Sequence, residues 1–395
     1  MENVLIWSQG DSLRINGVDL NEIADLFGTP TYVIDLDRVK ENFLRLDKAL
    51  KCPHVIAYAY KANHEPELVK LLAKLGSGAT VPSAFGVILA KLSGVPPEKT
   101  VLVGPSPSKG DLIEAMNFGA IISIESHSQA NAMRSMGRAR VMIRVNPGIG
   151  AGAHPGLVTG GKRSKFGLPP EEALALFNSL KTDMHALGFH VHIGSQIFSL
   201  DPFRAALDVI EELVERAGGV EIVDLGGGLG VPYSNESPFP LDEYAELVCE
   251  RVEEMGAKLF LETGRYIVAD AGYLLSRVNY VKEVGGEKWL LIDAGMNDLI
   301  RPALYGAKHE IICEGEGKER VLVAGPVCES SDFFGEYELP RLREGDLIAF
   351  KNAGAYGFSM ASRYNLRPLP AVVGIEGGRF RLLRPREDFC KTIFG

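Results

Sequence analysis

The sequence predicts a chain in two parts: a TIM-type (β/α)8 barrel over residues 30–270, followed by an antiparallel β-sandwich or β-barrel domain. Three observations support this prediction. With 395 residues the chain is too long to fold around a single hydrophobic core of ordinary size. Short apolar runs alternate with helical patterns from about residue 30 to 270, and about eight such units close a barrel. After residue 270 this alternation stops.

The barrel strands are expected at short apolar runs, most of which precede a helical pattern. Such runs are typical of strands that are buried on both faces of a parallel sheet. The runs are "TYVID" (31–35), "VIAYAY" (55–60), "SGATV" (77–81), "TVLVG" (100–104), "AIISI" (120–124), "ARVMIRVN" (139–146), "ALGFHVHIGS" (186–195), "VEIVDLGGG" (220–228) and "KLFLETG" (258–264).

Residues 271–395 read differently, as short strands joined by glycine-rich turns with little helix. The runs are at 273–295, 320–328, 345–354 and 370–383. The segment "VLIWSQGDSLRING" (4–17) has the same texture. We therefore expect residues 1–29 to join residues 271–395 in one β domain.

Composition and charge exclude several classes of protein. The net charge is −9 without a basic cluster, which argues against nucleic-acid binding and favours a small-molecule partner. The five cysteines are scattered, without a C-x-x-C motif or a disulfide pattern, so we expect a cytoplasmic protein. No apolar stretch reaches the roughly 18 residues of a membrane span, and no secretion signal stands at the N-terminus.

The candidate site residues follow the predicted barrel strands, because barrel chemistry lies at the carboxyl ends of the strands. Lys61 ends the run 55–60. A lone lysine is usually a surface charge. In an apolar barrel mouth, however, desolvation would lower its pKa and make the neutral amine available for a Schiff base.

Two further patterns follow later strands, and each has a plainer reading. "GGGLG" (226–230) allows backbone N–H groups to approach a phosphate, although a simple tight turn explains it too; the spacing does not fit G-x-G-x-x-G. His190 and His192 stand two apart on one strand face. They are compatible with a metal pair, with one ring stacked on an aromatic cofactor, or with ordinary core histidines. A catalytic metal site usually needs three protein ligands, and the sequence shows no further histidine-rich strand end to supply the third.

A reactive lysine, a phosphate loop and a stacking histidine together suggest pyridoxal phosphate. Its pyridine nitrogen needs a facing carboxylate, and Glu262 at the end of the run 258–264 is placed for that role. No metal is expected.

The sequence resembles the fold-type III pyridoxal-phosphate-dependent decarboxylases, and among them the diaminopimelate decarboxylases. The resemblance covers nearly the whole chain. It is carried by ordered blocks: "YAYKAN" (58–63), "RVNPG" (144–148), "TGGKRSKFG" (159–167), "HVHIGSQI" (190–197), "DLGGGLGVPY" (224–233), "ETGR" (262–265), "DAGMNDLIRPALY" (293–305), "CESSD" (328–332) and "GAYGFSMASRYNLRP" (354–368).

The resemblance implies roles for residues that match these blocks. Lys61 would bind the cofactor covalently, His192 would stack on its ring, and Glu262 would hold the pyridine nitrogen protonated. Cys328 would donate a proton to the substrate carbon from the second subunit of a homodimer with shared active sites. The cofactor would also contact Ser195, Gly227, Gly228, Gly264, Arg265 and Tyr356.

The expected substrate is meso-2,6-diaminopimelate, which would give L-lysine and CO2 in the last step of lysine biosynthesis. Its distal end carries an amine and a carboxylate, so its pocket needs cations and an anion together. The residues expected to bind it are Arg265, Arg301, Tyr305, Glu329 and Tyr356.

One block departs from the family. Where relatives commonly read Asp-Val-Val-Ser-Gly-Gly-Glu near the cofactor, this chain has "TVPSAFG" (80–86), with Thr80 in place of an acid. The departure leaves open a decarboxylase of another carboxylate-bearing amino acid, such as a siderophore or antibiotic intermediate, or of ornithine or arginine. A non-catalytic pyridoxal-phosphate-binding regulator and a metal-dependent hydrolase are the remaining alternatives.

Overall fold

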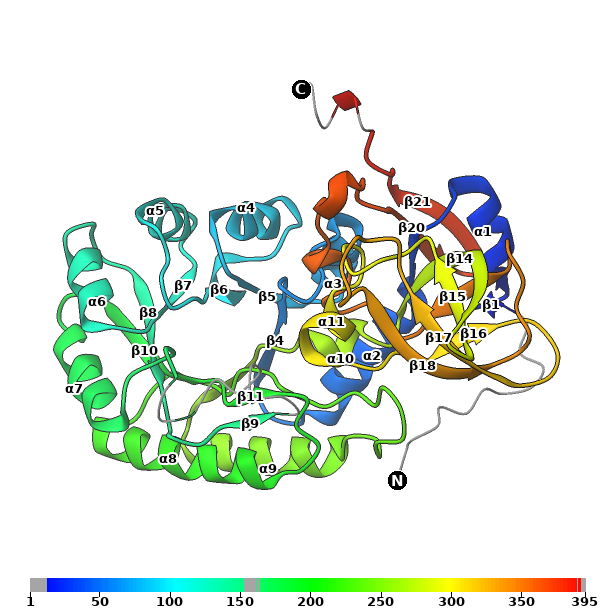
Figure 1. Ribbon diagram of the computed structural model, residues 1–395. Coiled ribbons are helices and arrows are strands. Elements are labelled where there is room, and N and C mark those ends of the chain that lie inside the picture. The colour runs from blue at the N-terminus through cyan, green and yellow to red at the C-terminus, as the bar shows by residue number, and fades with distance from the viewer. Residues whose placement is uncertain (1–12, 153–160, 162–163, 389, 392–395) are drawn as a thin grey trace. The chain divides into compact units, whose positions relative to one another are not determined.

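The computed structural model describes residues 13–152, 161, 164–388 and 390–391 (Figure 1). The chain divides into two compact units. The barrel unit comprises Asn42–Val231 and Ser237–Tyr266. The sheet unit comprises Met1–Glu41, Pro232–Glu236 and Ile267–Gly395.

The barrel unit is a closed barrel of eight parallel strands in the order β10-β12-β13-β4-β5-β6-β7-β8, as predicted. The strands are β4 (His54–Ala59), β5 (Gly78–Val81), β6 (Thr100–Leu102), β7 (Ile121–Ile124), β8 (Arg140–Val145), β10 (His185–Val191), β12 (Ile222–Asp224) and β13 (Lys258–Leu261). Each matches an apolar run of the sequence.

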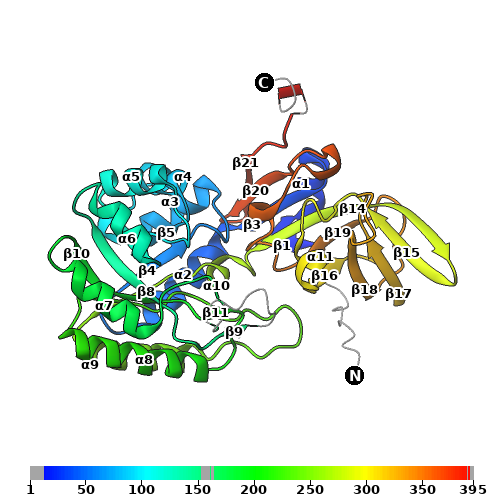
Figure 2. The ribbon, with the colours of Figure 1, turned by 60° about the vertical axis from the view of Figure 1, so that its left-hand side comes forward.

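Helices surround the barrel strands, as Figures 1 and 2 show from two directions. They are α3 (Pro66–Lys74), α4 (Ala84–Leu92), α5 (Lys109–Phe118), α6 (His127–Arg134), α7 (Pro170–Leu180), α8 (Asp201–Ala217) and α9 (Leu241–Glu254), with a 3-10 turn at Pro97–Lys99 and the short pair β9 (Ala151–Gly152) and β11 (Gly194–Ser195). The helix α2 (Leu36–Ala49) leads from the sheet unit into the barrel unit, and α10 (Arg265–Val268) leads back.

The part of the barrel interior that lies farther from the carboxyl ends of the strands is apolar. Inward-facing side chains of seven of the eight strands form one buried cluster: Val55, Ala57, Val101, Ile121, Met142, Leu187, Ile222 and Phe260. Branched and bulky residues fill a barrel of eight strands in this way, so the interior is a packed core rather than a channel. A reaction site in the barrel must therefore lie between this layer and the carboxyl ends of the strands.

The sheet unit is built on a nine-stranded, mostly antiparallel sheet with the path β18-β17-β15-β14-β3-β20-β21, to which β19 and β16 attach through β14. Among the strands that the structure describes in this sheet, only β15 with β17 and β3 with β20 pair in parallel. The strands are β3 (Thr31–Asp35), β14 (Gly272–Val284), β15 (Glu287–Ile292), β16 (Ile311–Cys313), β17 (Glu319–Ala324), β18 (Phe333–Leu339), β19 (Leu347–Phe350), β20 (Ala371–Glu376) and β21 (Arg379–Arg384). The helical pieces are α1 (Leu20–Phe27), α11 (Arg301–Tyr305), and 3-10 turns at Phe358–Met360 and Tyr364–Leu366.

The prediction that "TYVID" (31–35) is a barrel strand is wrong. This run forms β3, which lies in the sheet between β14 and β20. Four of its five residues are buried, as in the barrel strands. A short apolar run is equally suited to either environment, and its partners are distant in sequence.

The N-terminal segment was expected to join the β domain, but residues 1–12 of it lie outside the described residues. The following strands β1 (Arg14–Ile15) and β2 (Val18–Asp19) pair with each other. Their apolar side chains pack into the core of the sheet unit with Val33, Leu275 and Val373.

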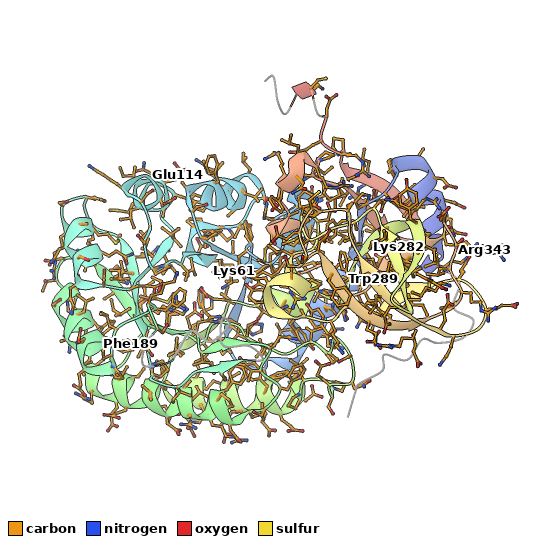
Figure 3. All side chains as sticks on the ribbon, viewed as in Figure 1. Lys61, Glu114, Phe189, Lys282, Trp289 and Arg343 are labelled. Atoms are coloured by element: carbon orange, nitrogen blue, oxygen red, sulfur yellow. A yellow bond between two sulfur atoms is a disulfide. The ribbon has the colours of Figure 1, made fainter. Side chains whose placement is uncertain are left out.

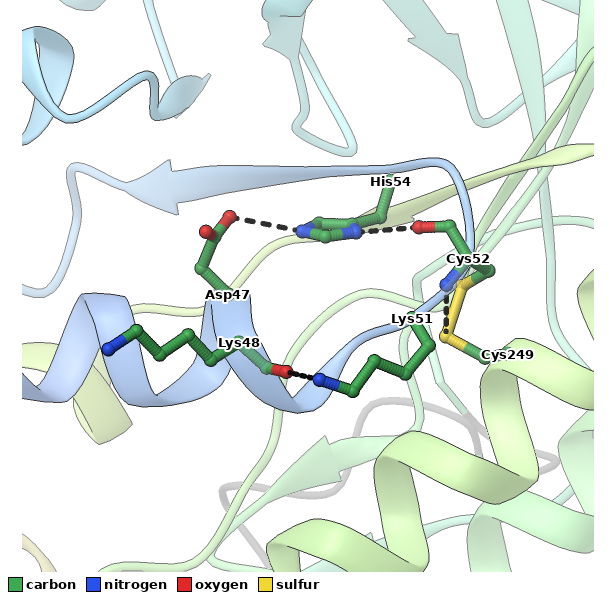
Figure 4. The surroundings of a disulfide bond; sticks show 6 residues. All are labelled: Asp47, Lys48, Lys51, Cys52, His54 and Cys249. Carbon is green, nitrogen blue, oxygen red and sulfur yellow. Dashed lines mark hydrogen bonds and ion pairs between the residues drawn. A yellow bond between two sulfur atoms is a disulfide. The ribbon is translucent and has the colours of Figure 1, made fainter.

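A disulfide joins Cys52 and Cys249, although the spacing of the cysteines showed no disulfide pattern (Figure 4). Cys52 directly precedes β4 and Cys249 lies on α9, 197 residues further on. Beside it, the ring of His54 contacts the Cys52 carbonyl oxygen at 2.8 Å and the Asp47 carboxylate at 3.1 Å. Cysteine pairing across such a separation depends on the fold and is not visible in the spacing.

Among the residues that the structure describes, no helix is both long enough and apolar enough to cross a membrane.

Candidate active site

A layer of polar side chains lies directly above the apolar interior of the barrel, toward the carboxyl ends of the strands. The strand register places Arg144, His190 and Asp224 side by side on β8, β10 and β12. Because side chains alternate along a strand, a residue two positions after an inward-facing residue also faces inward. Four members of the polar layer follow the apolar layer at this spacing: Ser123 after Ile121, Arg144 after Met142, Asp224 after Ile222, and Glu262 after Phe260.

Lys61 lies in the turn that follows β4, at the position that the strand pattern predicts (Figure 3). Its neighbours Tyr60 and Ala62 are buried, but Lys61 itself is exposed. The expected burial of this lysine in an apolar mouth is therefore wrong. A long lysine stem can follow apolar surface and still present its amine to solvent, so the amine is accessible for reaction.

Glu262 is a buried carboxylate of the site and follows the last strand of the barrel, β13. Its Oε2 lies 3.4 Å from His190 Nε2, while its Oε1 has no hydrogen-bond partner among the described residues. Burial alone would raise the pKa of Glu262, but His190, Lys61 and Arg144 together hold this pKa below its ordinary value. Glu262 is thus an ionised acceptor with an unused oxygen atom.

His192 is held by the backbone of the glycine loop. The Gly227 N–H donates to His192 Nδ1 at 3.0 Å, so Nδ1 is an acceptor and carries no proton. Burial and the nearby positive charges of Lys61 and Arg144 hold the pKa of His192 well below its ordinary value. The ring is therefore neutral and fixed in one tautomer, as a stacking role requires. The Gly227 amide itself is used to orient this ring.

The glycines of "GGGLG" permit close backbone approaches that any side chain would block. Gly228 has a φ of +104°, and a Cβ on it would lie 2.7 Å from the Gly194 carbonyl oxygen. A Cβ on Gly227 would lie 2.5 Å from the Glu262 carbonyl oxygen. The loop is thus packed directly on the ends of β11 and β13, and it is more than an ordinary turn. Gly264 is similarly enclosed, by the side chains of Ala59 and Ala62.

Ser195 and Arg265 meet beside this loop. Arg265 Nη2 donates to Ser195 Oγ at 3.2 Å, and Arg265 is largely buried. A buried guanidinium next to a hydroxyl group and a glycine loop is a suitable combination for a phosphate dianion.

The structure therefore brings seven predicted residues together at the carboxyl ends of the barrel strands: Lys61, His192, Ser195, Gly227, Gly228, Glu262 and Arg265. The remaining predicted residues, apart from Gly264, belong to the sheet unit.

Arg301 is buried and firmly held within the sheet unit. Its Nη1 lies 3.0 Å from His309 Nε2, and its guanidinium carbon lies 4.5 Å from the centre of the Tyr233 ring. His309 Nδ1 in turn contacts the Lys351 carbonyl oxygen at 2.8 Å. Arg301 is thus not an ordinary surface arginine. Tyr305 ends the same short helix and is half-buried.

Cys328 and Glu329 are exposed neighbours on a loop of the sheet unit. The Cys328 N–H donates to Asn365 Oδ1 at 3.2 Å, and Glu329 accepts a hydrogen bond of 2.8 Å from the Tyr364 hydroxyl. These two hydrogen bonds join the loop of Cys328 and Glu329 to the segment of Tyr364 and Asn365, and the Cys328 thiol remains exposed.

Tyr356 is half-buried and has a φ of +57°, a left-handed conformation that is costly for a residue with a side chain. Such conformations are enriched at functional sites, which is consistent with the predicted role of Tyr356.

Thr80, the departure from the family pattern, is a buried residue of β5. Its hydroxyl donates to the Ala57 carbonyl oxygen on β4 at 3.2 Å, and its own carbonyl oxygen accepts from the Tyr60 N–H at 3.0 Å. Thr80 therefore connects β5 to the strand that ends at Lys61. The following Phe85 on α4 is almost fully exposed.

Sequence reasoning missed most of the polar layer. Ser123, Arg144 and Asp224 were not predicted as site residues, although Arg144 and Asp224 stand in the matching blocks. Arg144 and Glu125 form a buried ion pair with an N–O distance of 2.7 Å. The available signal was a polar residue at an inward position near the end of several of the apolar runs.

These residues fit pyridoxal phosphate. The unpartnered, ionised oxygen of Glu262 suits a protonated ring nitrogen, the glycine loop with Ser195 and Arg265 suits a phosphate, and Lys61 supplies the amine.

The chain is similar to known proteins along most of its length. Residues 36–269 match the family model described as "Pyridoxal-dependent decarboxylase, pyridoxal binding domain". The diaminopimelate decarboxylase of Aquifex aeolicus is 38% identical, over 95% of this chain and 94% of that protein. That of Methanothermobacter thermautotrophicus is 39% identical, over 97% and 95%.

Solved structures show the same relationship. The diaminopimelate decarboxylase of Helicobacter pylori in complex with L-lysine superposes with a TM-score of 0.90 at 35% identity, covering 94% of this chain and 98% of that one. The lysine decarboxylase of Selenomonas ruminantium has a TM-score of 0.83 at 26% identity, covering 93% and 97%. Because both the family model and full-length relatives match, this chain belongs to the pyridoxal-dependent decarboxylases, in the family of the diaminopimelate decarboxylases.

Proposed function

We propose that this chain is a pyridoxal-phosphate-dependent carboxy-lyase that converts meso-2,6-diaminopimelate to L-lysine and CO2, the last step of lysine biosynthesis. The observation that carries the proposal is the pairing of an accessible Lys61 with a buried, ionised Glu262 at the same end of the barrel. The full-length similarity to diaminopimelate decarboxylases supports the choice of substrate.

Each barrel residue then has a defined task. Lys61 supplies the amine that holds the cofactor, and Glu262 keeps a proton on the ring nitrogen through its unused oxygen. The neutral ring of His192, fixed by the Gly227 N–H, provides a flat face for stacking. Ser195, Arg265 and the glycine loop hold the phosphate, with Gly264 and Tyr356 as further contacts. When it is bound, pyridoxal phosphate accepts the electron pair that departing CO2 leaves on the α-carbon.

The α-carbon must then receive a proton, and we assign this step to the Cys328 thiol. Cys328 is exposed on its own unit, which suits delivery into the active site of a second copy of the chain. We therefore propose a homodimer with shared active sites.

Substrate choice rests on the distal carboxylate of the substrate. Arg301 is pre-organised by His309 and Tyr233, and a fixed planar guanidinium binds a carboxylate with high selectivity. Arg265, Tyr305, Glu329 and Tyr356 complete the proposed substrate-binding set. The Glu329 carboxylate would bind the distal amine.

A second candidate is decarboxylation of a different amino acid, because the chain also resembles a lysine decarboxylase and carries Thr80 in place of an acid. Lysine, ornithine and arginine lack a distal carboxylate, so they would forgo the charge-assisted contact that a carboxylate makes with the guanidinium of Arg301. We therefore rank this candidate second.

The test is release of CO2 by the purified protein with pyridoxal phosphate, compared by kcat/KM across meso-diaminopimelate, lysine, ornithine and arginine. We expect meso-diaminopimelate to be preferred by at least about 100-fold, the scale of one lost charge-assisted hydrogen bond. Turnover of another amino acid with none of meso-diaminopimelate would refute the assignment.

We also propose a cytoplasmic location, which a biosynthetic role favours. The Cys52–Cys249 disulfide weighs against it, because disulfides are rare in reducing compartments of most organisms. Fractionation of the source cells decides between the two.

A further inference from the structure

Three buried titratable side chains lie together in the polar layer of the barrel. His190, Asp224 and Glu262 each offer a nitrogen or oxygen atom, and these atoms all lie within 4.8 Å of one another. Two carboxyl groups so close in a buried site cannot both stay ionised without a compensating charge. The cluster must therefore distribute protons among its members, and His190 is its one basic group.

His190 is held on one side by a hydrogen bond and faces Glu262 on the other. Its Nδ1 lies 2.8 Å from the Ser123 hydroxyl on β7, and its Nε2 lies 3.4 Å from Glu262 Oε2, which is close enough for an ion pair but lacks the geometry of a hydrogen bond. A hydroxyl group can both donate and accept, so Ser123 orients the ring without dictating its charge. His190 is completely buried.

We propose that His190 is a positioning residue for the cofactor: it keeps the Glu262 carboxylate ionised and aimed at the ring nitrogen, while Asp224 holds the proton of the cluster. The inference rests on the proposed function, because it requires pyridoxal phosphate to bind against Glu262. His190 acts through Glu262 and does not itself touch the reacting atoms.

The two carboxyl groups have opposite environments, which supports this division of roles. Burial and the charge of Glu262 raise the pKa of Asp224 to about 7, although its Oδ1 accepts the Gly226 N–H. The pKa of Glu262 is lowered despite burial, and His190 is the strongest of the groups that lower it. Two carboxyl groups whose pKa values are pushed apart in this way divide the acidic and basic roles between them.

The other charged and titratable groups around the cluster do not replace His190. Arg144 lies beside it in the register, but its guanidinium is paired with Glu125 at 2.7 Å. Burial raises the pKa of Tyr244 on α9, so its hydroxyl stays neutral and supplies no positive charge to Glu262. Lys61 also lowers the pKa of Glu262, but the Lys61 amine is the group that would bind the cofactor covalently.

The test is the dissociation constant of pyridoxal phosphate from the apoprotein, measured by fluorescence titration from pH 5.5 to 8.5. In His190→Gln the pKa of Glu262 should rise, because burial raises it and the strongest group that opposes burial is gone, so the acid limb of binding moves to higher pH. We expect binding about tenfold weaker than wild type near pH 6 and similar to wild type near pH 8.5. Ser123→Ala, which removes only one hydroxyl group, should shift the limb in the same direction by less.

Controls separate this role from a structural one. His185→Gln alters an exposed histidine of the same strand and should bind the cofactor like wild type at every pH. In the Glu262→Gln background, His190→Gln should cause no further change, because its only route of action is already removed. A loss of affinity that is equal at all pH values, or no loss at all, would overturn the inference. Wild-type protein that binds no pyridoxal phosphate would instead overturn the proposed function.

Discussion

Removal of the Cys52–Cys249 disulfide should lower the stability of the barrel unit strongly and leave its chemistry intact. Cys52 precedes β4, and Cys249 lies on the helix that precedes β13. β4 and β13 are the first and last strands of the barrel, and they pair with each other to close it. The disulfide therefore fastens the seam where the two ends of the barrel meet.

The size of the effect follows from the loop that the disulfide closes. For a separation of 197 residues, the chain-entropy relation gives a stabilisation of about 5 kcal/mol. In a domain of 150–250 residues each kcal/mol corresponds to about 2–4 °C. We therefore expect Cys249→Ser to lower the melting temperature by roughly 10–20 °C.

The assay is thermal unfolding followed by circular dichroism, with and without reductant, together with a thiol count on denatured protein. Cys390→Ser is the matched control, because Cys390 is exposed and unpaired. Three of the five thiols should react before reduction and all five after it. Equal melting temperatures for Cys249→Ser and Cys390→Ser, or five reactive thiols in unreduced protein, would refute the reasoning.

Three further predictions concern individual residues. Arg301→Lys should raise KM for meso-diaminopimelate by about tenfold or more with little change in kcat, because lysine cannot reproduce the planar contacts with His309 and the substrate; steady-state kinetics measure this split. Gly228→Ala should weaken binding of pyridoxal phosphate at least about tenfold by equilibrium titration, since its Cβ would meet the Gly194 carbonyl oxygen at 2.7 Å; wild-type affinity would contradict the close approach. Burial raises the pKa of Asp298 to about 7, so the folded state binds a proton that the unfolded state releases, and this residue costs stability progressively as the pH rises from about 4 to 7. Asp298→Asn should therefore gain stability relative to wild type between pH 5 and pH 8, by up to about 4 kcal/mol in denaturant unfolding, and a gap that does not change with pH would contradict this.

The eight strands of the barrel were predictable because each is a short apolar run bounded by turn residues. Such a run indicates that a strand is buried, but it does not indicate which strands pair with it. For this reason β3 (Thr31–Asp35) was assigned to the barrel, although it pairs with β14 and β20 in the sheet. The pairing of Cys52 with Cys249 was missed for the same reason, because it depends on closure of the barrel.

The candidate site was predictable where a residue type is unusual in its place. Lys61, the glycine loop and Glu262 stand at the ends of apolar strands, where a charge or a run of glycines needs a reason. Ser123 and Asp224 gave a weaker signal, since a single polar residue in a strand is commonly on its outer face. The register that turns them inward toward His190 is a property of the closed barrel.

The central claim, that Lys61 anchors a cofactor that this chain uses to remove CO2, is tested most directly by one paired measurement. Visible absorption after addition of pyridoxal phosphate is recorded for wild type and Lys61→Ala, and CO2 release from meso-diaminopimelate is then assayed on the same samples. We expect wild type to retain the cofactor through borohydride reduction and dialysis and to release CO2, and Lys61→Ala to do neither. Covalent retention of the cofactor by Lys61→Ala, or a wild-type protein that binds the cofactor and releases no CO2 from this substrate, would contradict the account.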